Sequence, residues 1–261
     1  MRMHRHSEGF LFARSLLAAL VISVITLSPL VLLTALSGCS SGSDGENPPP
    51  DDGTNEPILC PCSADVYIDA LYPDENMDYM TTGTTRILLA TYRPTKGISR
   101  GLFLFDIPET LTAADVQEAQ IFLSGCSPSH CESGFSGVVR FYALNIPFIE
   151  NGQFGSTWYS LDGGDWDDSV HTEATLPEGT GWNEAVNGQP QADAQGFDIT
   201  LLLQNNLGKV RENGIMMRFV KDEVQYEEDG TYYHQNVASR ESPAFYPDEF
   251  APFISITLKE E

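Results

Sequence analysis

Two apolar runs on either side of a proline-containing link form the clearest pattern in the chain. They lie within residues 99–125, SRGLFLFDIPETLTAADVQEAQIFLSG. The run at 102–105 has the length of a buried strand, and residues 119–123 alternate with the period of a half-buried strand. Two such strands joined by a link that contains Pro108 favour a β-sandwich over a helical fold.

The same two-residue period recurs along the rest of the chain. It predicts further strands at 63–69, 85–91, 138–144, 215–219 and 253–258. We expect a solvated face on the first of these, because Val66 and Ile68 alternate with polar neighbours, and a polar face for Arg218 in the strand at 215–219. Helical patterns are scarce. The segments 111–116 and 200–207 predict a turn or two each, and 145–195 predicts irregular structure.

Residues 1–38 have the pattern of a lipoprotein signal peptide. Basic residues precede an almost wholly apolar run, and Leu36-Ser37-Gly38-Cys39 resembles a bacterial lipobox. The resemblance implies cleavage before Cys39 and lipidation of its thiol, which would anchor the protein to a membrane. The run is also long enough for an uncleaved transmembrane helix, but Pro29 and the small residues before Cys39 favour cleavage. Ser40 resembles the sorting pattern for the outer membrane, so we expect an outer-membrane or cell-surface location.

The segment 39–57 predicts a lipidated flexible linker, and 58–261 predicts one β domain. The linker is rich in Ser, Gly, Asp and Pro, which bury too little apolar surface to become ordered.

The chain after the signal peptide is strongly acidic. Residues 1–38 hold three of the 14 basic and one of the 37 acidic residues, which leaves 11 basic and 36 acidic residues and a net charge of −25 on residues 39–261. This charge disfavours nucleic acid and anionic lipid as direct partners.

Four cysteines remain after lipidation, an even number that favours two structural disulfides in an exported chain. They are Cys60, Cys62, Cys126 and Cys131. Three pairings are possible, including a short loop between Cys126 and Cys131 and cross-pairings that tie the N-terminal pair to that loop.

Several segments in sequence order resemble the DNRLRE family, which is also classed among carbohydrate-binding modules. They are ADVYID at 64–69, YPDENMDY at 72–79, RGLFLFDI at 100–107, GFDITLLLQ at 196–204, NGIMMRF at 213–219, ASRE at 238–241 and APFISIT at 251–257. The resemblance spans about residues 63–259. It implies a jelly-roll-like antiparallel β-sandwich on a secreted or cell-surface protein, and an ion pair between Arg240 and Glu241 near the last strand.

Two groups of residues are candidates for ligand binding. Aromatic rings beside carboxylates suit sugars, which points to Trp158, Tyr159, Trp166 and Trp182, although these rings could instead pack against the core. Clustered carboxylates suit calcium, which points to Asp69, Asp74 and Asp78 in one loop and Asp162 and Asp165 in another. Neither loop has the spacing of a known calcium loop, and both could be solvated acidic loops.

The sequence gives little support for catalysis. It has no nucleophile elbow of the G-x-S-x-G type, and its histidines lack ligand spacing. Its many carboxylates leave open a pair for glycoside hydrolysis. We therefore predict a non-catalytic surface lipoprotein that binds polysaccharide, with structural calcium as a candidate cofactor. The alternative is a structural or assembly component of the envelope that binds a protein partner.

Overall fold

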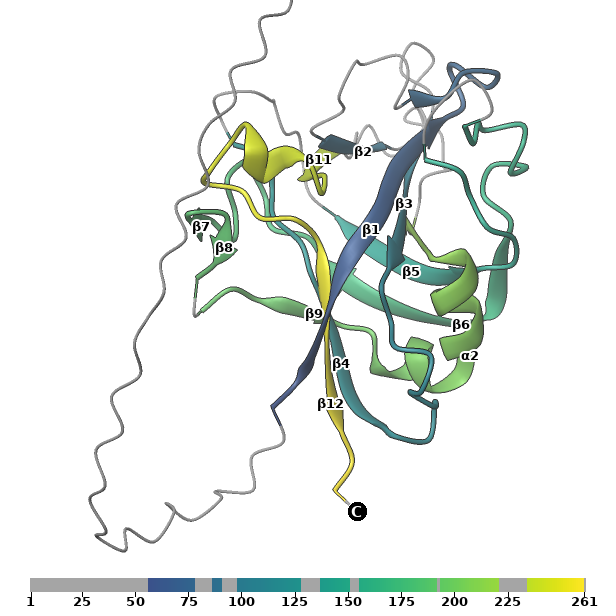
Figure 1. The fold of residues 1–261 in the computed structure, drawn as a ribbon. Coiled ribbons are helices and arrows are strands. Elements are labelled where there is room, and N and C mark those ends of the chain that lie inside the picture. The colour runs from purple at the N-terminus through teal and green to yellow at the C-terminus, as the bar shows by residue number, and fades with distance from the viewer. Residues whose placement is uncertain are drawn as a thin grey trace, which may run out of the picture. The chain divides into compact units, whose positions relative to one another are not determined.

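Antiparallel strands make up most of the structure, a computed structural model, and the described residues contain one α-helix (Figure 1). The structure describes residues 56–77, 86–90, 98–127, 137–150, 155–191, 193–220 and 234–260. Within these ranges, ten strands form one large, nearly barrel-shaped sheet, which confirms the predicted all-β class and is consistent with a sandwich. The predicted signal peptide, Cys39 and nearly all of the predicted linker lie outside the described residues.

The main sheet has the order β6-β5-β10-β3-β1-β12-β4-β9, with β2 and β11 paired beside β3. Its strands are β1 (Ile58–Asp69), β2 (Arg86–Ala90), β3 (Ser99–Phe105), β4 (Val116–Phe122), β5 (Val138–Leu144), β6 (Trp166–Thr175), β9 (Gly196–Asp198), β10 (Ile215–Phe219), β11 (His234–Ala238) and β12 (Phe253–Leu258). A short hairpin, β7 (Ala185–Val186) and β8 (Gln189–Pro190), and a 3₁₀ turn, η1 (Ser242–Ala244), lie outside it.

The first strand joins the two halves of the sheet. Residues Ile58 to Pro61 pair with β12, and residues from Cys62 to Asp69 pair with β3. The register shifts between Cys62 and Ala64, as at a β-bulge, and bulges bend a strand and increase its twist. Beyond Ala64, β12 no longer pairs with β1, so this edge of β1 is available to loops.

The main core fills the space between the two halves of the sheet. Alternating residues of β1, β3, β5 and β10 enter it, including Tyr67, Phe103, Phe141 and Met217, all of which are buried. Ile121 and Ile254 enter from the opposite half. These positions have the two-residue period that the sequence shows, so the strand assignments at 102–105, 119–123, 138–144, 215–219 and 253–258 are confirmed.

A second core lies on the other face of β1, β3, β5 and β10. Val66, Leu102, Met216 and Tyr142 stand in register across these strands, and the loop after β5 covers them. The predicted solvated face of residues 63–69 is therefore wrong. Tyr67 on that face enters the main core, Asp65 and Asp69 are buried as well, and the loop covers the opposite face, which carries Val66. Arg218 was expected on a polar face but is only 9% exposed.

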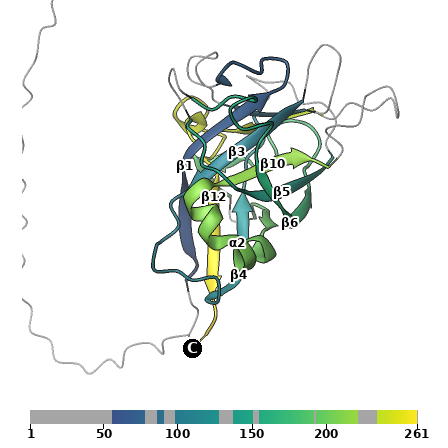
Figure 2. The ribbon, with the colours of Figure 1, turned by 90° about the vertical axis from the view of Figure 1, so that its right-hand side faces the viewer.

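Two segments contain more regular structure than their patterns predict. Helix α2 (Thr200–Asn213) has 14 residues where a turn or two was expected, and it packs against β4, β5 and β6 (Figure 2). Its buried residues Leu202, Leu203, Leu207 and Val210 supply the stabilising apolar face. Strand β6 lies within the region 145–195 that was expected to be irregular. The segment 111–116 contains turns and the start of β4 instead of a helix.

Candidate functional site

Two loops that are about 80 residues apart in the sequence lie side by side at one end of the sheet. The loop after β1 contains Pro73, whose carbonyl oxygen accepts a hydrogen bond from the backbone N–H of Tyr159 at 3.0 Å. The Asn76 side chain bridges the same loops, since its Nδ2 donates to the carbonyls of Glu150 at 3.0 Å and Ser156 at 2.9 Å. The structure therefore unites the two segments that the sequence singles out separately.

These loops carry exposed aromatic rings among carboxylates. Tyr72 is 43% exposed and Tyr159 is 66% exposed, while Trp158 is half-buried. Asp74 and Asp162 are exposed in the same two loops. We call these five residues the two-loop surface. Its rings can contact an apolar sugar face and its carboxylates can accept hydroxyl hydrogen bonds, which is the combination that sugar recognition uses.

Local hydrogen bonds hold the first of these loops. Both carboxylate oxygens of Asp69 accept hydrogen bonds, from the Leu71 N–H at 2.7 Å and the Ser99 hydroxyl at 2.8 Å. Burial raises the pKa of Asp69. Its carboxyl group thus anchors the start of the loop, and both of its oxygens are used in hydrogen bonds within the protein.

Close packing holds the second loop against the first. A Cβ atom on Gly155 would come within 2.4 Å of the Asn76 amide nitrogen, so only glycine fits between the loops. The backbone turns from Trp158 to Gly164, with Gly163 at φ +74° accepting a hydrogen bond from Arg100. The close contact between Gly155 and Asn76 and the left-handed backbone conformation of Gly163 fix the position from which Tyr159 projects.

Three predicted sugar-binding tryptophans make contacts within the protein. The guanidinium of Arg100 lies over the rings of Trp158 and Trp166, at 4.8 and 5.0 Å from their centroids, and Arg218 lies 5.2 Å from the Trp166 centroid. Such contacts are favourable cation–π interactions and strengthen when desolvated, as for Arg100, which is 2% exposed. Trp182 is 8% exposed and packs edge-on against Phe197 in the main core.

The predicted calcium ligands do not gather into one group within the described residues. Asp69 is 4% exposed, Asp74 and Asp162 are exposed, and Asp165 accepts a hydrogen bond from Asn145 at 2.8 Å. Asp78 lies outside the described residues. A calcium site in either of the two loops stays a prediction.

Three other carboxylates do come together, at the edge of β1 that β12 leaves. Ligand oxygens of Asp65, Glu150 and Glu241 lie within 4.8 Å of one another, a spacing that suits a metal ion. Arg240, however, donates to both carboxylate oxygens of Glu150 at 2.9 and 2.7 Å and to Glu241 at 2.8 Å. The predicted Arg240–Glu241 ion pair is confirmed, and the guanidinium supplies positive charge to two of the three carboxylates.

Asp65 is the buried member of this acidic cluster and is 3% exposed. Its Oδ2 accepts the Arg240 backbone N–H at 2.7 Å, and its own N–H donates to Glu150 at 2.9 Å. Burial, reinforced by the charges of Glu241 and Glu150, raises the pKa of Asp65 to about 8. Burial also raises the pKa of Glu241. The cluster therefore holds fewer negative charges at neutral pH than its three carboxyl groups suggest.

The predicted disulfide cysteines form no disulfide pair within the described residues. Cys60 and Cys62 carry free thiols on the same strand. Cys126 is buried near the end of β4, and Cys131 lies outside the described residues. Burial raises the pKa of Cys60 to about 11 and also raises that of Cys62, so both thiols are poor nucleophiles in the folded protein.

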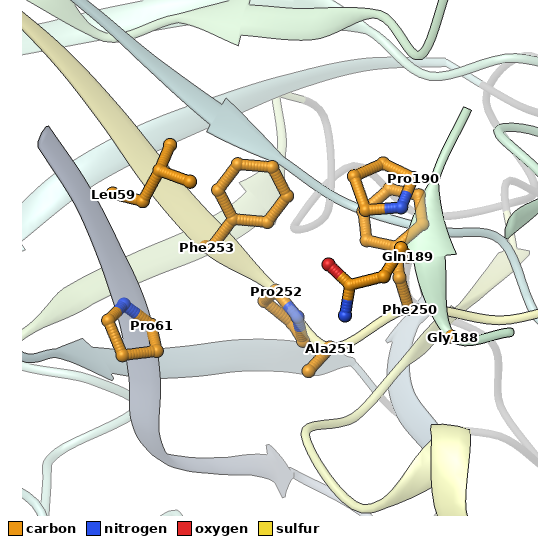
Figure 3. Close-up of a pocket in the computed structure, with 9 residues that line it drawn as sticks. All are labelled: Leu59, Pro61, Gly188, Gln189, Pro190, Phe250, Ala251, Pro252 and Phe253. Atoms are coloured by element: carbon orange, nitrogen blue, oxygen red, sulfur yellow. The ribbon is translucent and has the colours of Figure 1, made fainter. Parts of the chain in front are cut away.

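A separate groove lies where β1 and β12 face the β7–β8 hairpin (Figure 3). It has a volume of about 250 Å³. Leu59 and Phe253 lie on one side of it, and Gln189 and Pro190 lie on the other. The remaining lining residues are Pro61, Gly188, Phe250, Ala251 and Pro252.

Comparison with known proteins gives no match to a family model and no match to a curated sequence. Membership of the DNRLRE family therefore stays a prediction. No helix in the described ranges is both long and apolar enough to cross a bilayer.

Three kinds of residue at these sites have no recognisable signal in the sequence. Tyr72 lies in a segment whose acidic residues stand out, and no pattern marks its ring as exposed. Glu150 lies in a stretch without periodicity, so its contact with Arg240 has no local signal. Leu59 precedes the strand predicted at 63–69, and Phe253 begins the strand predicted at 253–258, but periodicity does not reveal which face of a strand bears a groove.

Proposed function

We propose that the protein is a non-catalytic, lipid-anchored binding module of the cell surface, and that its two-loop surface binds a neutral polysaccharide. The observation that carries this proposal is the hydrogen bond between Tyr159 N–H and Pro73 O, which joins two loops that each expose a tyrosine. The resemblance to a family of carbohydrate-binding modules supports the same function. Lipidation at Cys39 would hold the domain at the membrane.

The charge of the domain favours a neutral ligand over an acidic one. Residues 39–261 have a net charge of −25, and Asp74 and Asp162 add local negative charge to the two-loop surface. An acidic polysaccharide would be repelled, whereas a neutral one would meet hydrogen-bond acceptors and aromatic rings. Calcium bound near these carboxylates would reduce this repulsion. Ligand binding should therefore be measured both with calcium and with a chelator.

A glycan array probed with the full-length chain in mild detergent tests the proposal. We expect binding to neutral polysaccharides, and we expect Tyr159→Ala and Tyr72→Ala each to weaken it about tenfold, because each removes a ring that covers apolar sugar surface. Phe245→Ala is the matched control, since Phe245 is 65% exposed and lies in a different segment. A lack of binding to all neutral glycans, or equal losses in all three variants, would contradict the proposal.

A further inference from the structure

The groove between β1, β12 and the β7–β8 hairpin is a second surface that differs in chemistry from the two-loop surface. Side chains of Leu59, Pro61, Pro190, Phe250 and Phe253 line it, and Gln189 supplies the one polar side chain among the lining residues. Phe253 also stacks on Phe122, with ring centroids 4.7 Å apart, which extends apolar surface toward β4. A sugar here would bury hydroxyl groups against groups that do not hydrogen-bond, at a cost in free energy.

The size of the groove suits amino-acid side chains. Its volume of about 250 Å³ is below the roughly 300–1,000 Å³ of pockets that enclose drug-sized ligands. Leu59 is 62% exposed, so its side chain is accessible to a partner. Grooves lined by aromatic and proline residues bind extended, proline-containing peptides because such peptides lose little conformational entropy on binding.

The charge around the groove indicates the charge of its ligand. Exposed Glu184 and Asp248 lie next to the elements that line it, and a hydrogen bond from Ala185 N–H to Asp248 O holds these elements together at 3.0 Å. The lining contains no Lys or Arg. The net charge of −25 on residues 39–261 attracts basic segments over the Debye length and repels acidic ones.

We propose that this groove binds the apolar side chain of a basic, extended segment of another protein. The apolar residue is buried against Leu59, Phe253 and Pro190, and flanking Lys or Arg residues face Glu184 and Asp248. The amide of Gln189 is available to a backbone group of the bound segment. The domain would then have two surfaces, one for glycan and one for protein.

Three fluorescein-labelled peptides test this inference by fluorescence anisotropy with the full-length chain. The first has the sequence Lys-Lys-Pro-Leu-Pro-Lys-Lys, the second replaces each Lys with Glu, and the third replaces Pro-Leu-Pro with Gly-Ser-Gly. We expect the first peptide to bind at least tenfold more tightly than either other peptide, because only it combines an apolar anchor with complementary charge. Its affinity should fall as salt is raised from 0.05 to 0.5 M, with these concentrations chosen to span strong and weak screening.

Two variants make the location of binding testable. Leu59→Asp places a charge in the groove and should weaken binding of the Lys-Pro-Leu-Pro-Lys core about tenfold. Leu201→Asp is the matched control, because Leu201 is 53% exposed on α2 and the charge change is the same. Both positions are exposed, so both variants should fold.

Three outcomes would overturn the inference. Equal affinity for the three peptides would show that neither the anchor nor the charge is recognised, and equal effects of the two variants would place binding elsewhere. Concentration-dependent self-association that Leu59→Asp abolishes would assign the groove to a second copy of the chain. None of these outcomes depends on glycan binding, so the inference and the proposed function can fail separately.

Discussion

Asp65 shows how a single buried carboxyl group links stability to pH. In the unfolded chain this group ionises near pH 4, whereas in the folded protein burial raises its pKa to about 8. Between these two values the folded state binds a proton that the unfolded state lacks. The free energy of unfolding must therefore fall as the pH rises from about 4 to 8, and this contribution is fully present only below pH 4.

We expect Asp65→Asn to flatten this pH dependence. Asparagine keeps an oxygen that can accept the Arg240 N–H but does not ionise, so the variant should lose a slope of up to about 1.4 kcal/mol per pH unit. Urea unfolding at pH 5, 6, 7 and 8 measures the difference between variant and wild type. Parallel curves for the two proteins would show that Asp65 is ionised in the folded state.

Glu249 provides an independent test of the same reasoning. It is fully buried, and burial raises its pKa to about 7, so its contribution to stability is lost between about pH 4.5 and pH 7. Glu249→Gln keeps an acceptor for the Ser127 N–H. We expect this variant to differ in slope from wild type below pH 7 and to run parallel to it above pH 8. A slope difference that persists above pH 8 would contradict the assignment.

At the scale of elements, helix α2 is held by two kinds of contact with unequal strength. Its apolar face includes Leu203, which is fully buried in the main core. On its outer side, Lys209 donates to Asp167 of β6 at 2.5 Å and to Asn145 at 3.0 Å. Lys209 lowers the pKa of Asp167, but its side chain is 42% exposed and the ion pair is screened by solvent.

Substitutions in α2 should rank these contacts. We expect Leu203→Ala to lower the free energy of unfolding by about 2–5 kcal/mol, through lost transfer free energy and a cavity. Lys209→Met should cost less than about 1 kcal/mol at pH 7, and this loss should shrink as the pH falls below about 4, where Asp167 in the unfolded chain becomes protonated. Chemical unfolding at pH 7 and pH 3 measures both, and a larger loss for Lys209→Met would contradict this ranking.

The elements also show what local sequence could predict. Strands with a regular two-residue period, such as β3 and β5, were predictable because alternation reports burial directly. Strand β6 was missed because it is half exposed along its length and begins with Trp166-Asp167-Asp168-Ser169, which has little β preference. The helix was underestimated because its stability comes from packing on β4 and β5, which lie far away in the sequence.

The candidate site was predictable only in part, for the same reason. The sequence marked Tyr159 and the loop at 72–79 separately, and the hydrogen bond that joins these loops spans 86 residues. It also marked Trp182, whose ring lies in the main core instead, because aromatic side chains serve packing as well as binding. Contacts between distant segments decide which of these uses applies, and single-sequence patterns do not contain them.

At the scale of the whole molecule, the net charge gives the last prediction. A charge of −25 on residues 39–261 repels acidic polysaccharides at low salt, and screening by added salt weakens this repulsion. Binding of a neutral glycan depends on rings and hydrogen bonds at the two-loop surface, so its affinity should change less than about twofold between 0.05 and 0.5 M salt. Any binding of an acidic glycan should strengthen over the same range. Isothermal titration at the two salt concentrations distinguishes these cases, and an acidic glycan that binds most tightly at low salt would show that a local cation or basic surface outweighs the charge of the domain.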